Sequence, residues 1–133
     1  FPAAVKNTDE ALNYLAKLAQ ALATVVTSAA TTLTAAAAAF VTNGIYSLSG
    51  GTTCTITSPT AAQIVAALDN PQVGTSFVVS IVNANSGTAT MAGGTGVTVV
   101  GLATAATNTS ASFRGVVTNA TSGAEAVSLY RVD

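Results

Sequence analysis

The chain has 133 residues, of which half are hydrophobic and only 7% are charged, and its formal net charge is −1. This length suits one domain, or one small domain with an appendage, and the apolar content is sufficient for a core. The absence of a basic cluster argues against nucleic-acid binding, which needs grouped Lys and Arg. A surface so poor in charge repels its neighbours weakly, which favours a subunit of an assembly.

The residue types that carry most catalysis and metal binding are scarce. Histidine is absent and Cys54 is the single cysteine, so neither an intrachain disulfide nor a Cys/His metal site can form. A serine nucleophile has no histidine base, and helix-end positions account for Asp9, Glu10 and Asp69. The run 93–96, GGTG, lacks the lysine of a phosphate loop and indicates a turn. We therefore expect no enzyme, no metal and no cofactor.

The first expected element is a long helix. Asn7 or Thr8 is a suitable N-cap and Asn43-Gly44 a suitable stop, so the helix is predicted to run to Thr42. A heptad register with Leu12 at position a places apolar residues at every a and d position. We expect residues 1–44 to form an oligomerisation or docking segment, with an interface that contains Leu12, Leu15, Leu22, Val26, Leu33 and Phe40.

Two other interpretations of this segment are open. Residues 18–41 are uncharged and long enough to cross a bilayer, but they contain Thr, Ser and Gln and lack flanking basic asymmetry. Type IV pilins also begin at Phe and carry a long helix, but Val5 stands where pilins have Glu. We expect no membrane partner.

From residue 45 onward, short strands alternate with turn residues. The expected strands are 45–48 and 52–57 as a pair, three strands within 73–101 joined by two glycine turns, then 110–118 and 124–132. Apolar residues at a period of two predict the core. Its expected members are Phe77, Val79, Ile81, Val97, Val99, Phe113, Val117 and Leu129.

A short helix is expected between these strands. It begins with Ser58 as N-cap and Pro59 at the first position, or with a capping box of Thr60 and Gln63, and it ends at Asn70-Pro71. The predicted fold is mainly β. Residues 45–133 are expected to form an antiparallel, jelly-roll-like β-sandwich with this short plug helix, preceded by the long N-terminal α-helix.

Three stretches carry a resemblance to a known family: 60–101, 110–117 and 126–132. The short helix ending in Asn-Pro, the VGTSF strand start, the 83–87 turn, the TGVTVVG strand and the terminal LYRV resemble a β-rich module of tailed-phage virion proteins. That family includes capsid decoration proteins and fibres, and its members are often trimers.

The resemblance implies a non-enzymatic virion structural protein, a capsid decoration (cement) or head-fibre subunit that acts by oligomer and lattice contacts. The expected partners are further copies of the chain, as a trimer, and the major capsid protein or another virion protein. The expected location is the capsid surface of the extracellular particle. Two alternatives stay open: a receptor- or carbohydrate-binding fibre tip, and an extracellular filament subunit with a helical core.

Overall fold

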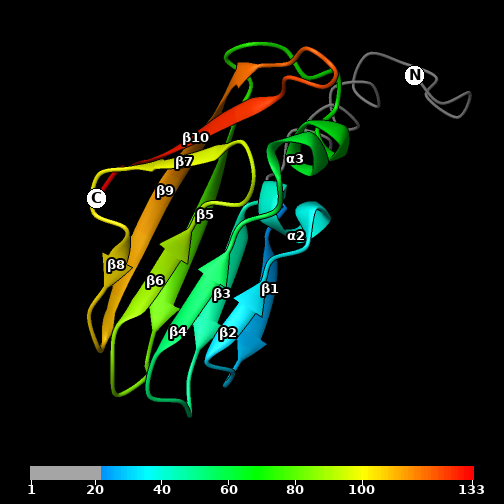
Figure 1. The fold of residues 1–133 in the computed structure, drawn as a ribbon. Helices are drawn as coiled ribbons and strands as arrows, with labels where there is room; N and C mark the ends of the chain where they lie inside the picture. The colour runs from blue at the N-terminus through cyan, green and yellow to red at the C-terminus, as the bar shows by residue number, and fades with distance from the viewer. Residues whose placement is uncertain (1–21) are drawn as a thin grey trace, which may run out of the picture.

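The computed structural model describes residues 22–133, which are mainly β (Figure 1). The strands form two sheets. Sheet A contains, in spatial order, β1 (Thr24–Ser28), β3 (Gly44–Leu48), β5 (Ser76–Asn83), β9 (Thr109–Asn119), β10 (Ala126–Arg131) and β7 (Val97–Val100). Sheet B contains β2 (Thr32–Thr34), β4 (Cys54–Thr57), β6 (Ala89–Ala92) and β8 (Thr104–Ala105). The two helices within residues 22–133 are α2 (Ala37–Val41) and α3 (Ala61–Ala67).

The chain winds between the two sheets. The strands β1 to β6 alternate between sheet A and sheet B, so β1, β3 and β5 are parallel neighbours, as are β2, β4 and β6. Parallel neighbours need a crossover connection, and here a strand of the opposite sheet supplies it. After this solenoid-like part, β9 pairs antiparallel with β5 and with β10, and β10 pairs parallel with β7.

One cluster of buried side chains fills the space between the sheets. Tyr46, Ile81 and Phe113 reach it from sheet A, and Ile56 and Met91 from sheet B. The predicted core is confirmed at six positions, which are Phe77, Val79, Ile81, Phe113, Val117 and Leu129. Val97 and Val99 pack against the cluster but stay half-buried, because β7 is the outermost strand of sheet A.

The prediction of an antiparallel, jelly-roll-like sandwich is wrong in its strand directions, because both sheets are mixed. The two glycine turns expected within 73–101 instead carry the chain from one sheet to the other, whereas the turn between β9 and β10 does join antiparallel neighbours. At Gly87 an added Cβ would lie 2.2 Å from the carbonyl oxygen of Thr52, so this glycine permits close approach of two chain segments. The residues 45–48 and 52–57 likewise lie in different sheets and do not pair.

The long helix predicted up to Thr42 is wrong over the residues that the structure describes. Residues 24–28 and 32–34 are strands, and α2 has five residues. The β-branched run Thr24-Val25-Val26-Thr27, and the threonines on both sides of Leu33, fit a pleated sheet better than a helix. Because β1 and β2 belong to the same two sheets as the later strands, the domain boundary predicted at residue 44 does not separate two units within residues 22–133.

The short helix α3 begins with the predicted capping box. The Thr60 hydroxyl accepts a hydrogen bond from the Gln63 N–H at 3.2 Å, and the Gln63 side chain accepts one from the Thr60 N–H at 3.0 Å. Ile64 is buried in the common core. Figure 1 shows α2 and α3 at the same end of the sandwich, where they contact each other.

At the end of the strands opposite α2 and α3, a buried asparagine forms hydrogen bonds between the two sheets. The side-chain nitrogen of Asn83 lies 2.9 Å from the carbonyl oxygens of both Gly87 and Ala105, and its side-chain oxygen accepts the Asn85 N–H at 3.0 Å. These bonds join β5 to the turn before β6 and to the end of β8. Buried polar side chains are usually hydrogen-bonded in this way.

Candidate interaction surfaces

Among the residues predicted as one oligomer interface, the four that the structure describes do not share a face. Leu12 and Leu15 lie outside the described residues. Leu22 is 72% exposed ahead of β1, whereas Phe40 is fully buried, with its ring centre 5.7 Å from that of Phe77. Because Phe40 belongs to the core of its own chain, it is not available to a partner.

Val26 and Leu33, the other two predicted interface residues, lie on the outermost strands β1 and β2 and are half-buried. The helical seam is therefore wrong for these residues and for Phe40. The fold nevertheless brings Val26 and Leu33 to the same side of the sandwich, because β1 and β2 are the edge strands of their two sheets.

The ionisable groups among residues 22–133 are dispersed, and no three acidic or cysteine side chains in this range gather as metal ligands. Arg131 pairs with Asp133, and this hydrogen bond holds the pKa of the Asp133 carboxyl below its ordinary value. Cys54 is buried in β4, and its burial raises the pKa of the thiol. A thiol that keeps its proton is a poor nucleophile, so Cys54 acts as a small apolar core residue.

The outer face of sheet A, meaning the side chains that point away from sheet B, is poor in charge. The strand registers align Val78, Arg114, Tyr130 and Val100 across β5, β9, β10 and β7. Tyr130 is 40% and Val100 42% exposed, and Arg114 is exposed between Val78 and Tyr130. Arg114 is the single charged residue at the outward positions of the strands described in sheet A.

The same face continues to the other edge of sheet A with valine and hydroxyl side chains. Val25 is exposed on β1, and Val82 is exposed on β5. The hydroxyls of Ser80 and Ser112 lie 3.2 Å apart on neighbouring strands. A strand that is apolar on both faces, as β5 is, is usually covered on both. The exposure of Val82 shows that its outer face is uncovered within residues 22–133.

The outer face of sheet B is a lattice of threonines. Thr32, Thr55, Thr90 and Thr104 occupy one row across β2, β4, β6 and β8. Thr34 and Thr57 begin a second row. The repeated Thr-x-Thr at 32–34 and 55–57 is a signal in the sequence for this face, but the row becomes visible only through the parallel registers.

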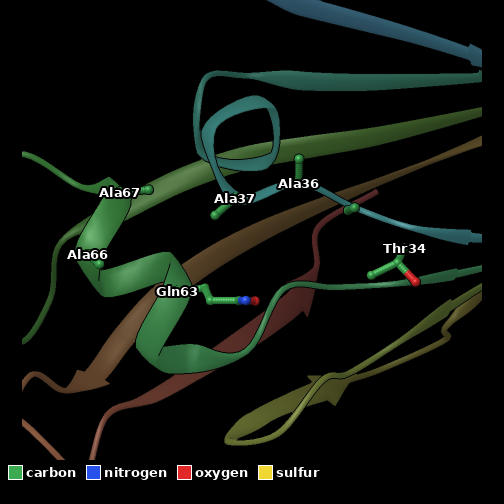
Figure 2. A pocket seen from close by; sticks show the side chains of 7 residues that line it. Thr34, Ala36, Ala37, Gln63, Ala66 and Ala67 are labelled. Atoms are coloured by element: carbon green, nitrogen blue, oxygen red, sulfur yellow. The ribbon is translucent and has the colours of Figure 1, made fainter.

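A shallow groove lies between the start of α2 and the exposed side of α3. Figure 2 shows Ala36 and Ala37 on one side and Gln63, Ala66 and Ala67 on the other. The lining consists mostly of alanine methyl groups. The Gln63 side chain is already used in the capping box, so the groove presents little chemistry of its own.

Neither helix among residues 22–133 is long and apolar enough to cross a membrane. Comparison of the chain with models of protein families, with curated proteins and with solved structures finds no match.

Proposed function

We propose that the chain is a non-enzymatic structural protein of a virion, a capsid decoration (cement) or head-fibre subunit. The observation that carries this proposal is the outer face of sheet A, where Tyr130 and three valines are exposed and Arg114 is the single charge. Exposed apolar side chains that cluster on one face mark interaction sites. The resemblance of residues 60–101 to phage virion modules supports the same conclusion.

The expected partners are further copies of the chain and the major capsid protein or another virion protein. Tyr and Arg are over-represented among the residues that dominate protein interfaces, and here Tyr130 and Arg114 are cross-strand neighbours. Each valine, serine or threonine contributes less to the binding energy of an interface. Strong attachment must therefore come from contact area that is repeated by symmetry and from multivalent binding. Oligomers, with the trimer implied by the resemblance as one form, supply that repetition.

The two alternatives receive less support. A carbohydrate-binding fibre tip needs several exposed aromatic rings, and among the aromatic side chains of residues 22–133 Tyr130 is the exposed one. A filament with a helical core was suggested by the long helix, but residues 24–28 and 32–34 are strands.

The proposal is tested by removing the protein from its particle and adding it back. We would strip the protein, confirm the loss by gel, and measure the temperature of genome release with and without added protein. A cement subunit raises this temperature when it is restored. Equal release temperatures would contradict the cement role and leave the fibre role.

Variants identify the face that binds. Tyr130→Ser is expected to weaken rebinding by about 30-fold or more, as loss of a central interface residue does. Thr55→Ala, on the opposite face, is the matched control and should rebind like the wild type. Binding should depend weakly on salt, because few charges take part. Equal loss in both variants, or release at moderately raised salt, would contradict the assignment to the outer face of sheet A.

A further inference from the structure

The two sheets end together in strands with open edges. The edge strand of sheet A is β1, and that of sheet B is β2. Within residues 22–133 no strand lies beyond either of them. Figure 1 shows β1 and β2 at the same side of the molecule. Each sheet therefore presents a row of backbone groups on this side.

The hydrogen bonds identify which groups are open. In a parallel pair, alternate residues direct both their N–H and C=O toward the same neighbour. The Ser28 carbonyl accepts the Ser49 N–H at 3.0 Å, so the even-numbered residues of β1 face β3, and Val25 and Thr27 face outward. In β2, the Thr31 carbonyl that precedes the strand accepts the Thr55 N–H at 2.9 Å, so the backbone groups of the odd-numbered residues face β4.

By this alternation, the backbone groups of Thr32 and Thr34 point away from β4. The open edge thus offers the N–H and C=O groups of four residues, two in each sheet. Such rows are templates for pairing with another strand.

The hydrophobic core is also incompletely covered at this side of the molecule. Val26 is the register neighbour of Tyr46, and Leu33 is the register neighbour of Ile56. Tyr46 and Ile56 are buried, whereas Val26 and Leu33 are half-buried against the same core. A partner at this end would cover both side chains.

The opposite end of sheet B is protected. Its edge strand β8 has two residues, and the Arg131 guanidinium donates hydrogen bonds to the carbonyl oxygens of Leu102 and Thr104 at 2.9 and 2.8 Å. Short edges and charged side chains are the usual protection of a sheet edge. The strands β1 and β2 contain no charged residue and no proline. At the opposite side sheet A ends in β7, but sheet B ends in the protected β8, so that side cannot pair with β1 and β2 at the same time, and head-to-tail stacking is disfavoured.

We propose that the β1–β2 end binds a second copy of the same end about a two-fold axis perpendicular to the sheets. In this arrangement β1 pairs antiparallel with β1 of the second copy while β2 pairs with its β2. The partner must present two strands separated by the distance between packed sheets, about 10 Å, and an identical end does so. The absence of charge means that the identical surfaces do not repel each other.

The test uses native mass spectrometry to measure the mass of the assembly that the full chain forms. The wild type should give an even multiple of 12.9 kDa, which is a dimer, or a hexamer where this contact joins two trimers. The double variant Thr27→Pro/Thr34→Pro removes two outward N–H groups, which an edge strand tolerates, and should halve the mass. The control Thr27→Val/Thr34→Val keeps both N–H groups and should keep the wild-type mass. An unchanged mass in the proline variant, or an odd multiple in the wild type, would overturn the proposal.

Amide hydrogen exchange of the wild-type chain keeps the test valid if the proline variant does not fold. The amides of Val25, Thr27, Thr32 and Thr34 should become protected as the protein concentration rises. Protection in a monomer would show that the chain covers its own edge and would overturn the proposal. Fast exchange of these amides in the oligomer would also overturn it.

Discussion

Tyr46 carries a buried hydroxyl that has no evident use. The residue is 1% exposed, and its ring centre lies 6.2 Å from that of Phe40. No group among residues 22–133 forms a hydrogen bond with the hydroxyl. Burial raises the pKa of Tyr46 from its ordinary 10.0 to about 12. The variant Tyr46→Phe removes this oxygen and keeps the ring.

The change in stability has two parts. A buried hydroxyl without a partner costs about 1–3 kcal/mol, so Tyr46→Phe should raise the free energy of unfolding at pH 7 by about 1 kcal/mol. At high pH the unfolded chain loses the tyrosine proton near pH 10, before the folded chain does near pH 12. The wild type therefore loses stability as the pH rises between these values. The difference between a pKa of 10.0 and one of about 12 corresponds to a loss of roughly 3 kcal/mol in the free energy of unfolding.

Urea unfolding followed by circular dichroism at pH 7, 9, 10, 11 and 12 would measure both parts. The advantage of Tyr46→Phe over the wild type should grow above pH 10, because the variant lacks this titration. The control Tyr130→Phe makes the same chemical change at an exposed ring and should alter the free energy at pH 7 by less than about 0.5 kcal/mol. A Tyr46→Phe protein that is less stable than the wild type at pH 7, or an advantage that stays constant with pH, would refute the reasoning.

Two further substitutions test the packing and the buried network. In Gly115→Ala the added Cβ would lie 2.2 Å from the Phe77 ring. We expect the free energy of unfolding, measured in urea, to fall by about 1–3 kcal/mol. An unchanged free energy would contradict the close approach of Phe77 to β9. Asn83→Asp replaces a donor to backbone carbonyls with a buried carboxylate, which can only accept. It should therefore lower the melting temperature by more than Asn83→Ala does. The reverse order would show that the network contributes little.

The local patterns of the sequence were sufficient for part of the fold. The period of two in β5, β9 and β10 placed Phe77, Phe113 and Leu129 correctly in the core. The capping box at Thr60 was also readable, because it depends on residues three positions apart. These features are decided by neighbours along the chain.

The pairing of the strands was not readable in the same way. A glycine turn that closes a hairpin and one that carries the chain to the opposite sheet use similar residues, and only packing distinguishes them. The alanine-rich stretch 22–42 satisfies a heptad, but its β-branched runs pair with β3 and β4 instead. The heptad pattern came from the alanines and leucines, whereas the β-branched residues between them favour strands.

The candidate surfaces depend on the same long-range pairing. Arg114 and Tyr130 are distant in sequence and become neighbours only through the register of β9 with β10. The threonine row of sheet B likewise requires the parallel registers of four strands. The sequence therefore indicated an uncharged surface without indicating how its residues are grouped.

The central claim is that this chain is part of a particle shell. The most direct measurement is immunogold electron microscopy of purified particles, with an antibody raised against the folded protein and particles lacking the protein as the control. Our account predicts label on the heads of intact particles, or on fibres that project from them, and no label on the control. Intact particles without label, or label confined to filaments free of particles, would contradict it.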